Sequence, residues 1–257
     1  MSGAISLSGR VAVVVGGTSG IGKAIALGLA RAGADVVATG RRESELAQVA
    51  QEIEATGRRT LRQTSDVTDA STLEALREGV LQSFGKLDIL VNAAGKTKRT
   101  PTLDLPLPEW QDILDTNLTG TLRACQVFGR PMLEKGYGRI INIASLSSFV
   151  GFYEVAAYAA SKAAVASLTK SLAVEWGKRG VLVNAIAPGV FVTSLNAALL
   201  EGTGRGRELL ARTPLGRFGA PEEVAPAAVF LASDAASFVN GEVLAVDGGF
   251  LASGVNQ

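Results

Sequence analysis

Three residues of one segment, Ser145, Tyr158 and Lys162, have types and spacing that suit proton transfer at an alcohol or ketone oxygen. Tyr158 and Lys162 lie four positions apart, so on a helix their side chains share one face. A tyrosine pKa is ordinarily about 10, and a lysine ammonium beside it favours the phenolate. We therefore expect a lowered pKa for Tyr158, which gives or takes the proton while the Ser145 hydroxyl holds the substrate oxygen. Because many helix surfaces carry a tyrosine and a lysine at this spacing, the interpretation depends on the rest of the chain.

The chain contains no histidine, which narrows the possible chemistry. Nucleophiles activated by histidine, histidine-ligated zinc and histidine proton shuttles are excluded. The 257 residues carry 25 Lys+Arg and 24 Asp+Glu, so a net charge of +1 offers no footprint for nucleic acid. Cys125 is the single cysteine, which excludes an internal disulfide and a thiolate metal cage and favours a buried thiol in a reducing compartment. We expect no metal site.

A second chemical feature is a glycine-rich segment that follows an apolar run and opens a segment of helical composition. Glycine permits a tight turn and a close backbone approach, while the free N–H groups of a helix N-terminus attract phosphates. Together with a second strand at Asp35–Thr39, the segment predicts the βαβ unit that cradles a dinucleotide pyrophosphate. The alternative is that the glycines serve only strand-to-helix packing. The predicted cofactor contacts here are Gly16, Thr18, Ser19, Gly20, Ile21 and Gly22.

The residues after the second strand bear on cofactor choice. An NAD site usually places an Asp or Glu about 20 residues beyond the glycines, where it binds the ribose 2′-hydroxyl. This position holds Gly40, followed by Arg41 and Arg42, and two guanidiniums can pair with a 2′-phosphate. The pattern favours NADP(H), with NAD(H) as the second choice. The alternative is that Arg41 and Arg42 begin a solvated helix, with Glu43 and Glu45 neutralising them.

The elements that position these residues follow from hydrophobic periodicity. Short, nearly continuous apolar runs alternate with segments of helical period, which is typical of a parallel sheet covered on both faces. We predict an α/β, single-domain, Rossmann-type doubly wound parallel sheet of about seven strands over residues 1–257. The expected strands are Val11–Val15, Asp35–Thr39, Leu87–Asn92, Arg139–Ala144, Val181–Ile186 and Glu242–Val246, with a weaker one at Arg59–Thr64. The expected helices are Ile21–Ala32, Glu43–Ala55, Asp69–Ser83, Glu109–Glu134, Val155–Gly177 and Pro221–Ala232.

Two segments, residues 96–108 and 188–220, have no clear element and follow predicted strands. We expect both to line a substrate pocket at the carboxyl ends of the strands. No apolar stretch approaches the length of about 20 residues that crosses a bilayer, and the first residues lack a signal-peptide pattern. The expectation is a soluble, cytoplasmic protein with no membrane partner.

With these residues identified, the chain resembles the short-chain dehydrogenase/reductase family over essentially its whole length. The further motifs that carry the resemblance are Asn92-Ala93-Ala94-Gly95, Asp66-Val67, Asn117, and Pro188-Gly189-Val190 followed by Thr193. The resemblance implies that Asn117, Ser145, Tyr158 and Lys162 are catalytic. It implies that the cofactor is contacted by Asp66-Val67, by Asn92-Ala93-Ala94-Gly95, by Pro188-Gly189-Val190 with Thr193, and by Tyr158 and Lys162. It also implies a homotetramer.

Three residues depart from the family pattern. Val15 stands where the family has a threonine before the glycine turn. Ala93 stands where the family has the second asparagine of the motif Asn92-Ala93-Ala94-Gly95. Gly40 leaves the acidic position of the cofactor site empty. Only the third departure bears on function, where it favours NADP.

The basic pair Lys98 and Arg99 follows Gly95 at the mouth of the expected cleft, and such side chains bind carboxylates. Family members that act on sugar acids and polyols, the gluconate 5-dehydrogenase and deoxygluconate dehydrogenase groups, carry a similar pair. The resemblance thus implies a secondary-alcohol dehydrogenase for a small-molecule sugar acid or polyol. Ser147 and Tyr153 complete the predicted substrate contacts. Tyr153 is not expected to be the acid/base, because Ala157 stands four residues after it.

Other interpretations stay open at this point. The basic pair can be a solvated loop. A 3-oxoacyl-[acyl-carrier protein] reductase is the alternative enzyme, with its carrier docked on Arg123, Arg130 or the Lys96–Arg99 cluster. A non-catalytic NADP-binding sensor or scaffold is a third possibility, and the intact set of Ser145, Tyr158 and Lys162 argues against it.

Overall fold

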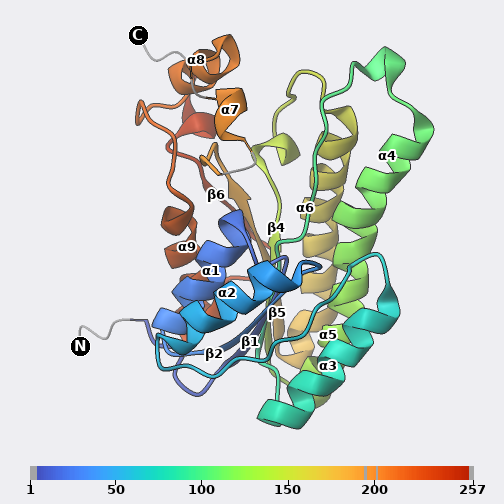
Figure 1. The fold of residues 1–257 in the computed structure, drawn as a ribbon, viewed down its shortest axis with the longest axis vertical. Coiled ribbons are helices and arrows are strands. Elements are labelled where there is room, and N and C mark those ends of the chain that lie inside the picture. The colour runs from blue at the N-terminus through green and yellow to red at the C-terminus, as the bar shows by residue number, and fades with distance from the viewer. Residues whose placement is uncertain (1–4, 194–195, 201, 255–257) are drawn as a thin grey trace.

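The computed structural model describes residues 5–193, 196–200 and 202–254, and in these residues six parallel strands form one sheet in the order β2-β1-β3-β4-β5-β6 (Figure 1). The order reverses direction between β1 and β3, which is the switch point where doubly wound sheets bind ligands. The strands are β1 (Val11–Val15), β2 (Asp35–Thr39), β3 (Ile89–Asn92), β4 (Gly138–Ile143), β5 (Val181–Pro188) and β6 (Val243–Val246).

Helices cover both faces of the sheet, so alternate strand side chains enter two separate cores. Val14 and Ile141 belong to the core under α1, α2 and α9, whereas Val13 and Ile140 belong to the core under α3, α5 and α6 (Figure 1). This burial on both faces explains the unbroken apolar runs of the strands. The described helices are α1 (Gly20–Arg31), α2 (Glu43–Glu54), α3 (Ala70–Phe84), α4 (Leu107–Leu114), α5 (Gly120–Lys135), α6 (Ala156–Trp176), α7 (Ala197–Leu200), α8 (Gly204–Ala211) and α9 (Ala225–Ala232).

Local signals in the sequence fix several helix ends. The Asp69 side chain accepts a hydrogen bond from the Ser71 N–H and caps the start of α3. Gly85 and Gly136 end α3 and α5 in the left-handed conformation, with φ of 72° and 73°. Among the described residues, no helix combines the length and apolar character that a bilayer crossing requires.

The seventh strand predicted at Arg59–Thr64 is wrong. The segment runs beside the edge strand β2, where the Val36 N–H donates to the Arg59 carbonyl and the Thr39 hydroxyl donates to the Gln63 carbonyl. These bonds are widely spaced, and one comes from a side chain, so no backbone ladder forms.

The single helix predicted at Glu109–Glu134 is interrupted. A π-helical turn, Asp115–Thr119, separates α4 from α5, and the Gly120 N–H donates to the Asp115 carbonyl five residues before it. Such a turn inserts one extra residue into the helix and is frequent at functional sites. Hydrophobic period does not reveal it, because the side chains on either side keep a helical pattern.

The segment 188–220 is more ordered than the sequence predicts. β5 extends to Pro188, and α7 and α8 bury Leu200 and Leu209 in a small core with Leu146 and Phe250. In Figure 1 this lobe lies at the upper left, and the chain before α4 rises at the upper right. Both lobes stand above the carboxyl ends of the strands, where the sequence places the substrate pocket.

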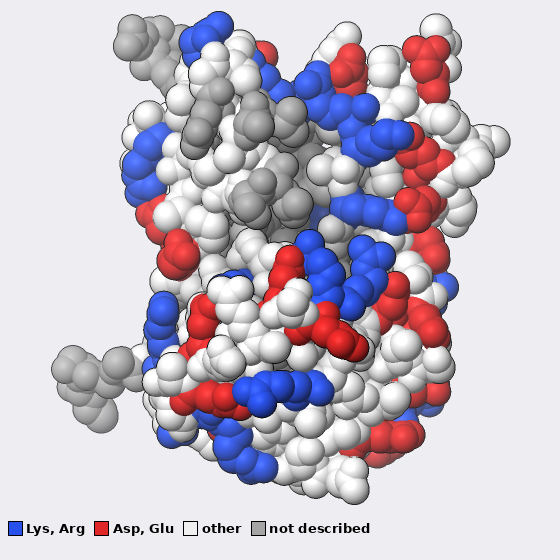
Figure 2. All heavy atoms as spheres, in the orientation of Figure 1, with Lys and Arg blue, Asp and Glu red and all other residues white. Residues whose placement is uncertain are grey.

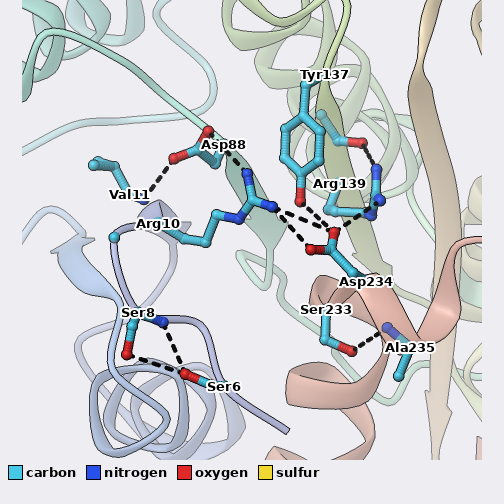
Figure 3. Close-up of polar contacts among 12 residues, drawn as sticks. Ser6, Ser8, Arg10, Val11, Asp88, Tyr137, Arg139, Ser233, Asp234 and Ala235 are labelled. Atoms are coloured by element: carbon cyan, nitrogen blue, oxygen red, sulfur yellow. Dashed lines mark hydrogen bonds and ion pairs between the residues drawn. The ribbon is translucent and has the colours of Figure 1, made fainter.

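A polar cluster ties the strands together at their opposite, amino ends (Figure 3). Asp88 is fully buried, accepts a hydrogen bond from the Val11 N–H over 2.9 Å, and forms ion pairs with Arg10, Lys86 and Lys135. One carboxylate therefore joins the starts of β1 and β3.

Tyr137 extends this cluster to β4. Its ring lies between the guanidiniums of Arg10 and Arg139, which are 4.1 and 4.5 Å from the ring centroid (Figure 3). The Tyr137 hydroxyl contacts Asp234, which also pairs with both arginines. This network stabilises the end of the sheet away from the candidate site.

Candidate active site

The glycine turn is held closely against the end of β3. A Cβ atom at Gly16 would lie 2.4 Å from the Ala94 nitrogen, and one at Gly22 would lie 2.1 Å from the Gly16 oxygen. Gly16 and Gly20 also adopt left-handed φ values of 77° and 52°. Glycine is therefore required here by both conformation and space.

The start of α1 fits an anionic group. Ser19 is the N-cap, yet in the described structure its side chain makes no capping bond, and the first turn carries no acidic residue. The N–H groups of a helix N-terminus left in this state are donors for phosphate oxygens. Thr18 and Ile21 flank the same turn. The residues present thus fit the pyrophosphate of a dinucleotide.

The two arginines after β2 have different surroundings. Arg42 pairs with Glu45 over 2.6 Å and also donates to the Ser19 hydroxyl, as the alternative interpretation of neutralisation anticipated. The side chain of Arg41 is 76% exposed and reaches Asp66 only at 3.8 Å. A Cβ atom at Gly40 would lie 2.8 Å from the Thr18 hydroxyl. The site therefore offers Arg41 as the more available cation and no carboxylate at position 40.

Asp66, which Arg41 approaches, is a charged acceptor. Its carboxylate accepts from the Thr68 N–H and hydroxyl at 2.9 and 2.8 Å. Burial favours the neutral acid, but the Thr68 bonds and the charges of Arg41 and Lys96 outweigh it, so the pKa of Asp66 is below its ordinary value. Val67, beside it, is buried against Gly120.

The motif at the end of β3 begins with a buried asparagine, and its three other residues are more accessible. The Asn92 side chain donates to the Asn142 side chain at 2.8 Å and to the Cys125 sulfur at 3.3 Å, inside the sheet. The Asn92 side chain thus holds β3 to β4. Ala93, Ala94 and Gly95 are more accessible; Ala93 and Ala94 lie against the glycine turn, and Gly95 lies beside Asn117 and Lys162.

Ser145, Tyr158 and Lys162 are brought together by β4 and α6. Ser145 follows β4, and its hydroxyl accepts from the Ser147 N–H at 3.1 Å. Tyr158 lies in the first turn of α6, with its ring centroid 5.8 Å from the Lys162 Nζ. Lys162 is buried and donates to the Ile143 carbonyl at 2.7 Å. The three residues form one polar site on the end of β4.

Burial shifts the pKa values of this site. Desolvation raises the pKa of Tyr158, and a hydrogen bond with Ser145 acts in the opposite direction. Without a cofactor, burial of the phenol thus outweighs its polar contacts, and the lowered pKa expected for Tyr158 beside Lys162 and a positively charged nicotinamide stays a prediction. Desolvation also lowers the pKa of Lys162 to about 8. At neutral pH the phenol is protonated and can donate to a substrate oxygen.

Asn117 joins the loop after β3 to α6. It lies in the π-helical turn, is buried, and its carboxamide accepts from the Lys96 N–H and donates to the Lys96 carbonyl, both at 2.9 Å. The same amide donates to the Ser161 hydroxyl at 3.0 Å, and Ser161 in turn donates to the Tyr158 carbonyl. Asn117 thereby fixes Gly95, where a Cβ would lie 3.5 Å from the Lys162 Nζ.

The segment after β5 completes the predicted cofactor site. The Gly189 N–H donates to the Val246 carbonyl at 2.8 Å, and a Cβ at Gly189 would lie 2.6 Å from Asp247. The Thr193 side chain lies 3.6 Å from the Cβ position of Gly20. Pro188 and Val190 lie on the same stretch. The structure thus places this segment beside the glycine turn, about 170 residues away in sequence.

The four residues predicted to contact the substrate differ in their burial and in their partners. Lys98 pairs with Glu109 at 2.6 Å, and Arg99 pairs with Glu154 at 2.7 Å. Ser147 is buried beside Ser145, while Tyr153 is 75% exposed. Both members of the basic pair therefore already carry acidic partners.

Several residues of the site have no clear signal in the sequence. Ser161 lies three positions after Tyr158, so its place on the same helix face can be anticipated from the spacing. Glu154 has no such signal in the sequence. In the structure its φ is 63°, which is unusual for a residue other than glycine. Arg205, on α8, falls in a segment where the sequence predicts no helix.

Comparisons with known proteins agree with this geometry. The family described as enoyl-(acyl carrier protein) reductase matches residues 15–251. A 2-dehydro-3-deoxy-D-gluconate 5-dehydrogenase of Bacillus subtilis is 45% identical over 250 residues, covering 96% of this chain and 97% of that protein. A D-threitol dehydrogenase of Mycolicibacterium smegmatis is 43% identical over 244 residues, covering 95% and 94%.

A solved structure is also similar to this chain over nearly its whole length. A crystal structure of a putative NAD(P)-dependent gluconate 5-dehydrogenase from Beutenbergia cavernae, with bound NADP, has a TM-score of 0.92 and 48% identity. The match covers 98% of this chain and 100% of that one. The motifs, the fold and these full-length matches agree, and the chain belongs to the short-chain dehydrogenase/reductase family.

Proposed function

We propose that this protein is an NADP-dependent oxidoreductase that interconverts a secondary alcohol and a ketone on a sugar acid or polyol. The observation that carries the proposal is the convergence of Ser145, Tyr158 and Lys162 beside the glycine turn. The names of the relatives, a deoxygluconate dehydrogenase and a threitol dehydrogenase, support the substrate class. Bound NADP in the Beutenbergia cavernae structure supports the cofactor.

Proton transfer falls to Tyr158. Its protonated phenol donates to the ketone oxygen in reduction, and the same group accepts the proton in oxidation. The Ser145 hydroxyl binds that oxygen and steadies the charge that develops on it. A cationic Lys162 favours the phenolate that forms, because it lies across the same helix face.

The dinucleotide supplies or takes up the hydride when it is bound. The N–H groups at the start of α1 would hold its pyrophosphate, and Arg41 its 2′-phosphate. Asn92 to Gly95 and Pro188 to Thr193 would line the two sides of the nicotinamide half. Asn117 would keep the segment at Gly95 in register with α6.

The test is the rate of NADPH oxidation, followed by absorbance, with 5-keto-D-gluconate or acetoacetyl-CoA as the acceptor. We expect kcat/KM for the sugar acid to exceed that for the thioester about ten-fold or more. A preference for the thioester would favour the 3-oxoacyl-[acyl-carrier protein] reductase. NADPH binding with no turnover of either compound would favour the sensor.

The single-domain extent over residues 1–257, the homotetramer and the cytoplasmic location stay predictions. Light scattering after size-exclusion chromatography measures the assembly. A mass about four times that of one chain supports the tetramer, and a monomer contradicts it.

A further inference from the structure

Figure 2 shows basic side chains along the right-hand and lower rim of the hollow between the two upper lobes. Lys96, Lys98 and Arg99 come from the loop after β3, and Arg205 comes from α8. The core that seats α8 contains Leu209 and Leu146, with Phe152 packed against it. α8 therefore lies directly on the segment between Ser145 and Tyr158.

Arg205 lies on the side of α8 that faces this segment. It precedes the buried Leu209 by four residues, so the two side chains share one helix face. Burial lowers the pKa of Arg205, and the positive charge of Arg99 lowers it further, against the charges of Glu208 and Glu154. Phe152, which packs in the same core as Leu209, is two residues before Glu154, the partner of Arg99, so α8 and the loop of Arg99 meet at one segment.

The other cations of the hollow already have acidic partners. Lys96 pairs with Asp112, Lys98 with Glu109, and Arg99 with Glu154. Glu109 is held most firmly, because it also accepts from the Thr100 hydroxyl at 2.6 Å and its side chain is only 13% exposed. An incoming carboxylate would have to displace Asp112 or Glu109 to reach Lys96 or Lys98, and it would share the Arg99 guanidinium with Glu154.

Arg205 differs from these three residues. Within the described part of the chain it forms no ion pair, although it is half-buried and the positive charge of Arg99 acts on it. A partly desolvated cation beside a like charge gains most from an anion that reaches both. A guanidinium also presents two parallel donors, which match the geometry of a carboxylate.

We infer that Arg205 is a substrate-binding residue that holds the carboxylate of the sugar acid, with Arg99 beside it. The inference rests on the proposed function. Glu154 positions Arg99 for this contact, because its carboxylate binds the guanidinium and its carbonyl accepts from the Thr100 N–H at 2.9 Å. Specificity for an acid over a neutral polyol is then set from α8 as well as from the loop after β3.

The test compares Arg205→Gln with Arg207→Gln, a control on the same helix whose exposed guanidinium donates to the Gly202 carbonyl. The substrates are 5-keto-D-gluconate and L-sorbose, a neutral ketose with a hydroxymethyl group in place of the carboxylate. We expect Arg205→Gln to raise KM for the acid about ten-fold or more, with kcat and the KM for L-sorbose changed by less than about three-fold. Arg207→Gln should leave both substrates unchanged, and Arg205→Lys should restore part of the acid binding.

Two outcomes would overturn the inference while leaving the proposed function in place. One is an unchanged KM for the acid in Arg205→Gln, and the other is an equal rise for both substrates, which indicates a structural role. If the unaltered protein shows no preference for the acid over L-sorbose, the proposed sugar-acid specificity has failed, and the carboxylate contact fails with it. The preference of the unaltered protein between 5-keto-D-gluconate and L-sorbose therefore distinguishes failure of the proposed function from failure of the Arg205 contact alone.

Discussion

Lys162 donates a hydrogen bond from its Nζ to the carbonyl oxygen of Ile143, over 2.7 Å. Ile143 is the last residue of β4, and Ser145 follows two positions later. One strand end therefore carries the predicted serine and anchors the predicted lysine. The contact also draws the ammonium into a buried position, which lowers the pKa of Lys162 to about 8.

Lys162→Met should alter the pH dependence of stability. The folded protein binds fewer protons than the unfolded chain between pH 8 and 10.5, the two pKa values of this lysine. The free energy of unfolding of the unaltered protein should therefore rise, relative to the variant, by roughly 3 kcal/mol between pH 7 and 10.5. Urea titrations of both proteins without cofactor measure it. A difference that does not vary with pH would show that Lys162 has an ordinary pKa.

Tyr158→Phe should remove turnover and spare the cofactor site. The change deletes the hydroxyl that transfers the proton and keeps the ring, so kcat should fall about 100-fold or more. The dissociation constant for NADPH, measured by fluorescence, should stay within about three-fold. Tyr153→Phe is the matched control, because that tyrosine is exposed and should leave proton transfer unchanged. Activity of Tyr158→Phe within about ten-fold of the unaltered protein would refute the assignment.

Arg41→Ala should weaken NADPH about ten-fold or more and NADH less than about two-fold, because only NADPH carries the 2′-phosphate. Arg42→Ala should have a smaller effect on NADPH, since Arg42 is already bound to Glu45. Fluorescence titration with both dinucleotides gives the four constants. Equal losses for NADPH and NADH would place recognition of the 2′-phosphate elsewhere.

Asp88→Asn should destabilise the fold without changing the site. The substitution leaves the cations of Arg10, Lys86 and Lys135 without their buried partner, at a cost of about 2 kcal/mol, reduced from the fully buried case because those side chains are partly exposed. Asp234→Asn is the control, since Asp234 is 71% exposed and should cost less than about 1 kcal/mol. Thermal unfolding and KM measure the two effects. Equal losses for both variants would contradict the role of burial.

The sequence predicts most of the sheet and the polar centre of the site. Val11–Val15 and Asp35–Thr39 are strands at the predicted bounds, and the glycine turn follows the first of them. The spacing of Tyr158 and Lys162 predicts their shared helix face, because it is a local property. Ser145 joins them at the end of the neighbouring strand β4. The predicted strand at Arg59–Thr64 fails because the segment runs beside β2 with widely spaced bonds, and local composition does not report whether a backbone ladder forms.

The charge state of the site was decided by the tertiary structure. Arg99 meets Glu154, and Asn117 meets Lys96 and Ser161, through the packing of a π-helical turn and α6 that periodicity does not reveal. The raised pKa of Tyr158 and the lowered pKa of Lys162 have the same origin. Residue types and short spacings determined by themselves which groups can carry the reaction. Desolvation and ion pairing depend on neighbours that are distant in sequence, so only the folded chain determines which of those groups are buried, neutralised or left to bind a substrate.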